Sequence, residues 1–378
     1  MNFDFSEQER QFHMALETVV ADFDAPENRD AGRDGVDPDW IRSRHQALAG
    51  IGYLKLGLEE PPDKPCGSLH LMACQEILAS ACQSLFLTME MNARMFGRII
   101  HTWGTRHQKA QLLARVKDGE ILGSVALSEN AMNVTNDPLA TEGTETDDGV
   151  LVSGVKRLVV NASFADCIAV VGRMHDRTAI FLVDKKSAGL QVDDGLATIG
   201  YEAAGMAGIR LDGCRVPPAM VVLPGDEKVV IATLRRWENQ ILIGASLGMM
   251  KAAFLSAKAF ANTHHTGGKP IIAYQEVAFK LAEMLALYQT SQLLAYRTAW
   301  TTDNNQRERD GLTLCAKVFC TESAEKVASQ ALQVLSDTGY QRGHQAAIAY
   351  TCAKYAQIAG TSTEIARVMI GDEALGYR

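Results

Sequence analysis

Hydrophobic residues recur at helical spacing near the start of the chain. Ser6 is followed three residues later by Glu9, which is the signature of a helix-capping box. A second tract, 68–100, is small and apolar throughout, which predicts a helix buried on several sides. We therefore expect residues 1–120 to form a helical domain, interrupted by the proline-containing loop 57–67. The apolar positions after the capping box are Phe12, Leu16, Val19, Val20 and Phe23.

The pattern changes at Ile121, where short β-branched runs alternate with turn signals. Asp148-Gly149 and Asp194-Gly195 are dipeptides typical of tight reversals between strands. Residues 121–225 are therefore predicted to form a β domain. The runs that predict its strands include LVSGVKRLVV, DCIAVVGRM, TAIFLVD and GIRLDGCRVP.

Helical spacing returns after Pro224-Gly225 and continues through three long segments. In the first of these, Gly244, Gly248 and Ala252 recur every four residues, so another helix can approach closely on that face. Residues 226–378 are predicted to form a helix bundle, and the chain as a whole is of the α+β class.

Composition narrows the range of functions. A length of 378 residues excludes a single small module. Acidic residues outnumber basic ones, 45 to 37, and no basic run is interleaved with aromatics, so a nucleic-acid partner is not expected. The opening MNFDFSEQER has acids where a signal peptide has a basic region, and we expect no apolar stretch to reach the roughly 20 residues that span a bilayer. We expect no membrane association and a cytoplasmic location.

The eight cysteines show no C-x-x-C pair, and no histidine motif has zinc spacing. In a cytoplasmic chain they are expected to be reduced and mostly buried. His264 and His265 are adjacent, and neighbouring helical side chains diverge by about 100°, so they are interpreted as a helix-end pair. No metal site is predicted.

Motifs spread over the whole chain resemble, in their order, those of the acyl-CoA dehydrogenase superfamily. The resemblance implies an N-terminal helical domain, a middle β-barrel or β-sandwich and a C-terminal four-helix bundle, with FAD as the cofactor. The segments that carry it are GSVALSE (123–129), GVKRLVVNASFADCIAVV (154–171), RVPPAMVVLPG (215–225), HHTGGKPIIAYQEVAFKLAEM (264–284), QALQVLSDTGY (330–340) and IAGTSTEIARVMIG (358–371).

The resemblance also implies a reaction, the oxidation of the Cα–Cβ bond of an acyl thioester. A carboxylate removes the α-proton, and the β-hydrogen passes as hydride to flavin N5. Many relatives place this base where the present chain, aligned through Glu364, has Gly360. A minority place a Glu on the bundle helix before a small and apolar run ending in Leu-Gly, and Trp237-Glu238 precedes NQILIGASLG with that spacing. Glu238 is the predicted base; the alternative is an acid that stabilises the N-terminal turn of a helix.

Two groups of residues are implied to bind FAD, one at the isoalloxazine and one at the pyrophosphate and adenine across a subunit boundary. The second group implies a homodimer or homotetramer. The chain departs from the family at Leu158-Val159-Val160, which stands for Trp-Ile-Thr, at His264, which stands for Arg, and at Ser336-Asp337, which stands for Gly-Gly. The predicted cofactor residues are Leu127, Ser128, Leu158, Val159, Val160, His264, Gln275, Gln333, Ser336, Gly339, Ser362 and Glu364.

The segment implied to contact the substrate also differs from the family pattern, because NAMNVT follows Glu129 in place of the family's Pro-x-x-Gly-Ser-Asp. Asn130, Asn133 and Gly360 are predicted to meet a short or polar acyl group carried by CoA or by a carrier protein. We expect reoxidation by an electron-accepting flavoprotein or by oxygen, and a place in a polyketide or nonribosomal peptide extender-unit pathway.

A second hypothesis is a family-shaped protein that has lost redox chemistry and serves as a binding or scaffold subunit. The departures at His264, Val160 and Ser336-Asp337 favour it, whereas a carboxylate at Glu238 argues against it.

Overall fold

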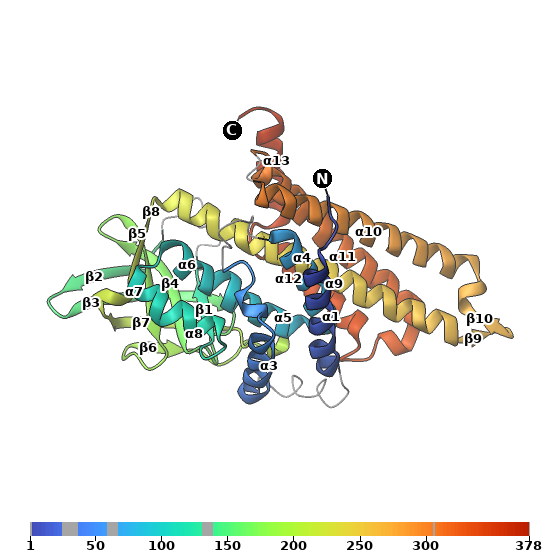
Figure 1. Cartoon of the computed structure of the whole chain (residues 1–378), viewed down its shortest axis with the longest axis horizontal. Helices are drawn as coiled ribbons and strands as arrows, with labels where there is room; N and C mark the ends of the chain where they lie inside the picture. The colour runs from blue at the N-terminus through green and yellow to red at the C-terminus, as the bar shows by residue number, and fades with distance from the viewer. Residues whose placement is uncertain (1, 25–36, 59–66, 131–138, 305–306, 378) are drawn as a thin grey trace.

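A computed structural model describes residues 2–24, 37–58, 67–130, 139–304 and 307–377. A β-sheet forms one end of the molecule, a long helix bundle reaches away from it, and the N-terminal helices pack between them (Figure 1). The predicted order of helices, β domain and helix bundle is confirmed.

The N-terminal part is helical, and the capping box of its first helix is present, since the Ser6 side chain accepts from the Glu9 N–H. The buried helical tract expected over 68–100 is present, but it is not one continuous helix. Cys82 is extended, with φ −153°, and ends one helix, while Met91–Gly97 winds as a π-helix around fully buried Asn92 and Arg94. The helices are α1 (Glu7–Ala21), α3 (Pro38–Gly50), α4 (Ser68–Ala81), α5 (Gln83–Glu90), α6 (Arg98–Trp103), α7 (Arg106–Gln108) and α8 (Ala114–Lys117).

The middle of the chain is a mostly antiparallel sheet with the order β6-β7-β3-β2-β4-β5-β8, in which β1 pairs in parallel with β4. The central strands β4 and β5 are buried almost throughout, as their continuous apolar runs require. The strands are β1 (Gly123–Ala126), β2 (Glu142–Thr146), β3 (Gly149–Val159), β4 (Cys167–Met174), β5 (Arg177–Asp184), β6 (Leu190–Val192), β7 (Ala207–Val216) and β8 (Val221–Gly225).

The bundle is built on the longest helix, α9 (Glu227–Thr263). A hairpin of β9 (His265–Thr266) and β10 (Lys269–Pro270) caps its far end. The other helices are α10 (Gln275–Asp303), α11 (Arg309–Gly339), α12 (Gln345–Ile358) and α13 (Thr363–Ala374).

The close helix approach predicted at Gly244 and Gly248 occurs against α4. A Cβ at Gly248 would lie 2.4 Å from the Cβ of Ala79, and one at Gly244 would lie 2.9 Å from Gln75. The main hydrophobic core runs from this contact through α5, α11 and α12, and a second core fills the sheet.

Among the described residues, α9 is long and apolar enough to cross a membrane by length and composition, contrary to the expectation that no stretch would be. Within its most apolar 18-residue window, 67% is buried inside the protein, as in the core helix of a bundle.

Candidate active site

Glu238 lies well inside α9, as its twelfth residue. The helix is capped by Asp226, whose carboxylate accepts from the Val229 N–H, and Glu227 is the acid of its first turn. The alternative interpretation of Glu238 as an acid that stabilises the N-terminal turn is therefore wrong.

The Glu238 side chain is half-buried among charged and polar groups of three elements. Burial raises the pKa of its carboxyl above the ordinary value, while Arg235, a backbone N–H of Gly360 and Lys317 oppose the rise. Lys317 on α11 is itself fully buried and donates to the Gln357 carbonyl at 2.8 Å. Burial lowers the pKa of Lys317 to about 8, although Glu238 opposes that shift. The carboxylate thus has a raised basicity and two cationic neighbours.

Gly360, where the commoner base of the resembling family would stand, faces Glu238 directly through its backbone N–H. It adopts φ +63°, a left-handed conformation that favours glycine, and a Cβ there would lie 2.5 Å from Asn239 Oδ1. Asn239 holds the next residue through two hydrogen bonds, accepting from the Thr361 N–H at 3.0 Å and donating to Thr361 Oγ1 at 3.1 Å. The local backbone has no room for a side chain at 360, so a second carboxylate cannot stand at that position.

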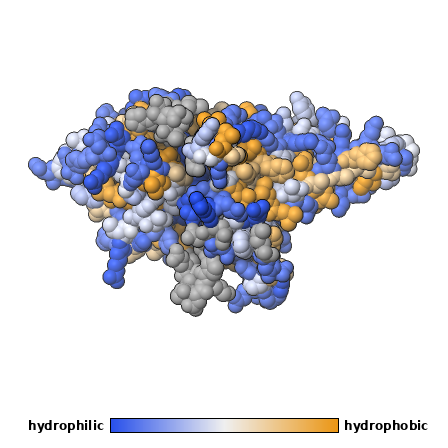
Figure 2. Space-filling view, turned by 90° about the horizontal axis from the view of Figure 1, so that it is seen from above, coloured by the Kyte–Doolittle hydropathy of each residue, from blue (hydrophilic) through white to orange (hydrophobic). Residues whose placement is uncertain are grey.

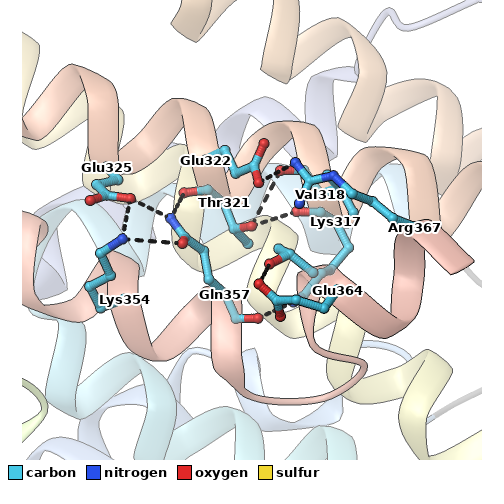
Figure 3. A network of polar contacts seen from close by, with 10 residues as sticks. Lys317, Val318, Thr321, Glu322, Glu325, Lys354, Gln357, Glu364 and Arg367 are labelled. Atoms are coloured by element: carbon cyan, nitrogen blue, oxygen red, sulfur yellow. Dashed lines mark hydrogen bonds and ion pairs between the residues drawn. The ribbon is translucent and has the colours of Figure 1, made fainter.

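A polar network on the other side of this loop joins α11, α12 and α13 (Figure 3). Gln357 donates to Glu325, which also accepts from Lys354 at 2.7 Å. Arg367 pairs with Glu322 at 2.5 Å. The network anchors both ends of the segment that presents Gly360 to Glu238.

Ser362 and Glu364, two predicted cofactor residues, lie at the start of α13 in this network. Ser362 is the N-cap and accepts from the Ile365 N–H, and Glu364 stands in the first turn. Backbone hydrogen bonding there lowers the pKa of Glu364. Their described contacts are those of a helix start, and their contact with FAD stays a prediction.

The loops predicted to line the isoalloxazine are brought together. The Arg157 N–H donates to the Ser128 carbonyl at 2.9 Å, and Ser124 Oγ donates to the Val160 carbonyl at 2.5 Å. Leu158 has φ +53° and is 52% exposed, so it presents an apolar surface beside Leu127 and Ser128. Val159 and Val160 are buried, so only their backbone can meet a ligand. An exposed apolar side chain suits a flat aromatic ring, and this end of the site fits FAD.

Two residues to which sequence analysis assigned no role fix these loops. Lys156 is fully buried and pairs with Glu129 at 2.6 Å, and burial lowers the pKa of its amine to about 8. Glu129 also accepts from the Ala140 and Thr141 N–H groups. The sequence shows a lysine two residues after Gly154 in a strand-like run, but it shows neither the burial of that lysine nor its partner.

The predicted substrate residues are only partly described. Asn130 is exposed and accepts from Arg157 at 3.1 Å, whereas Asn133 lies outside the described residues. Gly360 lies against Glu238, as the predicted roles of both residues require.

The remaining cofactor residues lie at the opposite end of the bundle. His264 follows Glu238 by 26 positions along α9, which corresponds to a rise of about 39 Å. His264 is the C-cap of α9 and stacks on Phe260, as expected of a helix-end histidine, and Gln275 begins α10. One chain does not bring the two groups of predicted FAD residues together.

At that far end, Gln333, Ser336 and Asp337 line an open hollow of about 530 Å³ together with the exposed Tyr340. Gly339 is buried beside it. Ser336 has φ +53° and ψ −134°, a conformation that glycine adopts without strain. Ser336 therefore holds a glycine-like conformation at the position where the resembling family has a Gly-Gly pair.

Comparison with known proteins is consistent with this geometry. The family model of the acyl-CoA dehydrogenase N-terminal domain matches residues 6–120, and that of the C-terminal domain matches residues 230–375. The chain is 25% identical to the benzylmalonyl-CoA dehydrogenase of Aromatoleum aromaticum, with 99% of both chains covered.

Solved structures show the same fold. The butyryl-CoA dehydrogenase of Megasphaera elsdenii superposes with a TM-score of 0.91 at 20% identity, covering 99% of this chain and all of that one. A prolyl acyl carrier protein oxidase superposes with a TM-score of 0.88 at 19% identity, covering 99% of this chain and 100% of that one.

Proposed function

The chain belongs to the acyl-CoA dehydrogenase family and is an FAD-dependent oxidoreductase, and we propose that it oxidises the Cα–Cβ bond of a short or polar acyl thioester with Glu238 as the base. The observation that carries this proposal is the contact between Glu238 and Gly360. Positions 238 and 360 correspond to the two positions at which members of the family carry the catalytic base. They are adjacent in this structure, and position 238 carries the carboxylate.

The charged surroundings of Glu238 suit proton removal from carbon. A thioester α-proton is a weak acid, so the base must be more basic than an exposed carboxylate and still ionised near neutral pH. Burial raises the basicity of the Glu238 carboxylate, and the Arg235 and Lys317 cations keep it ionised near neutral pH. FAD, when bound, supplies the acceptor for the hydrogen that leaves Cβ.

For the substrate, we propose a thioester on the phosphopantetheine arm of CoA or of a carrier protein. The likeness to a prolyl acyl carrier protein oxidase supports a tethered, polar acyl group. The differences from the family pattern after Glu129 also support a polar acyl group, because that segment in the family touches the thioester arm. Three features stay predictions. They are a place in an extender-unit pathway, reoxidation by a flavoprotein or by oxygen, and a cytoplasmic location.

We further propose a homo-oligomer that builds each FAD site from two chains. The separation of about 39 Å along α9 between Glu238 and His264 exceeds what one extended FAD can bridge within a chain. Hydrophobic surface gathers on the arm of the molecule away from the sheet (Figure 2), where Phe279 and Leu293 of α10 are 68% and 59% exposed. Such a patch is typical of a protein interface.

The scaffold hypothesis has less support from this site. A subunit without chemistry has no need for a half-buried carboxylate with a raised pKa, and Ser336 preserves the glycine-like turn at the far end.

The test compares Glu238→Gln with Glu227→Gln, which removes a carboxylate from the first turn of the same helix. Both FAD-loaded proteins are mixed anaerobically with a panel of acyl-CoA and acyl-carrier-protein thioesters. We expect both to keep the flavin spectrum, and only Glu227→Gln to be bleached like the wild type. Equal bleaching of Glu238→Gln would place the base elsewhere. A wild-type protein that stays colourless after incubation with FAD would favour the scaffold hypothesis.

A further inference from the structure

Two histidines and a cysteine gather between α1 and α4, far from Glu238 in the chain. The ligand atoms of His13, His70 and Cys74 all lie within 4.8 Å of one another. His13 Nε2 and His70 Nδ1 are 3.1 Å apart, and Cys74 Sγ is 3.8 Å from His70 Nε2. Spacing along the sequence does not reveal this cluster, because its ligands come from two packed helices.

The arrangement has the spacing of a helical metal site. His70 and Cys74 are four residues apart on α4, and Glu9 and His13 are four residues apart on α1, so each pair shares one helix face. Glu9 is close enough for its charge to act on His13, on His70 and on Cys74.

Surrounding groups favour a compact, partly dry site. Cys74 is fully buried, and both histidines are half-buried. Phe5 meets the His13 ring edge-on at 4.8 Å, and Phe12 meets the His70 ring at 5.2 Å. The charges that act on His13 are those of Glu9 and Glu17, which attract a cation, and that of Lys251, which opposes it. Cys74 is also close to the charges of Arg94 and Glu90.

We propose that His13, His70 and Cys74 bind one Zn²⁺ ion, with the fourth position taken by water. Two imidazoles and a thiolate are ligands that zinc prefers, at distances of about 2.0–2.3 Å. The His13 and His70 rings are stacked, with centroids 5.0 Å apart and planes inclined by 23°, so both rings must turn to direct a nitrogen lone pair at a common ion. The ion replaces the thiol proton of Cys74, which passes to solvent, and each neutral imidazole carries its N–H on the nitrogen that faces away from the metal. The site links α1 to α4.

The proposal is tested on the FAD-loaded full chain after dialysis against a chelator. Zn²⁺ is titrated calorimetrically in two buffers of different ionisation enthalpy, and Co²⁺ is used as an optical probe. We expect one Zn²⁺ per chain, about one proton released per ion, and a thiolate-to-cobalt absorption band. Cys74→Ser should lose that band and bind Zn²⁺ at least tenfold more weakly.

Two further variants keep the result interpretable. His13→Gln changes a half-buried surface position of α1 and should also weaken binding at least tenfold, even if Cys74→Ser does not fold. The double variant His107→Gln with Cys315→Ser removes the same ligand types from exposed positions and should bind like the wild type. Wild-type protein that takes up no Zn²⁺, or a His13→Gln variant with unchanged affinity, would overturn the proposal and leave the cluster as a hydrogen-bonded histidine pair.

Discussion

Replacing Gly360 by alanine tests whether the backbone opposite Glu238 is as tightly fixed as its contacts indicate. The new Cβ would meet Asn239 Oδ1 at 2.5 Å and Leu242 Cδ1 at 3.2 Å. Asn239 is 2% exposed, so it cannot move into solvent, and its displacement breaks both hydrogen bonds to Thr361.

The expected loss has two parts. A left-handed conformation costs a residue with a side chain about 1–2 kcal/mol. Two buried hydrogen bonds contribute about 1 kcal/mol each, and more if the Asn239 amide is left without partners. Gly360→Ala should therefore lower the free energy of unfolding by about 3–4 kcal/mol.

A matched control isolates the second part. Gly67 has the same φ of +63°, and a Cβ there meets nothing within 4 Å among the residues that the structure describes, so Gly67→Ala should cost only the backbone term. Urea unfolding of the FAD-loaded proteins at equal concentration gives the two losses, whose difference should be about 2 kcal/mol. If Gly360→Ala loses no more than Gly67→Ala, the contact with Asn239 does not hold this loop and the reasoning is wrong.

Three further predictions concern neighbouring features. Ser336→Gly should raise the free energy of unfolding by about 1 kcal/mol, because it removes backbone strain; a lower urea midpoint would contradict this. Lys156→Met should cost about 3–5 kcal/mol and weaken FAD retention, because it leaves the Glu129 carboxylate buried and unpaired. Lys354→Met, which breaks a more exposed pair, should cost at most about 1 kcal/mol in the same assay. For Glu238, kcat/KM should fall as pH drops through a pKa above 4.5, because the base must be ionised. The raised pKa means that the folded state binds the Glu238 proton more tightly than the unfolded state does. The contribution of Glu238 to stability should therefore decline as pH rises through the same window. If the free energy of unfolding depends on pH in the same way in the wild type and in Glu238→Gln, this prediction is wrong.

The sequence was informative wherever a local pattern determines local structure. The capping box at Ser6, the close approach at Gly244 and Gly248, and the order of helices and strands follow from spacing and residue type alone. The π-helical turn at Met91–Gly97 could not be predicted in this way, because it depends on where buried Asn92 and Arg94 find partners in other segments.

For the candidate site, the sequence pattern identified individual residues but not which of them are in contact. Glu238 and Gly360 were each singled out, yet their contact joins positions 122 residues apart. The Glu129–Lys156 pair and the His13–His70 contact likewise depend on which elements pack together. Residues that act across such distances in the chain leave no periodic signal.

The length of α9 determines how inactivating substitutions in two different chains of one oligomer affect each other. In an assembly whose sites each use the sheet end of one chain and the far end of another, damage at Glu238 and damage at Gln333 belong to different halves of a site. Two inactive variants, one altered at each position, would restore one working site when refolded together as a mixed dimer. Mixing the variants only after assembly would restore nothing until the subunits exchange, so the recovery of activity would time the exchange of chains.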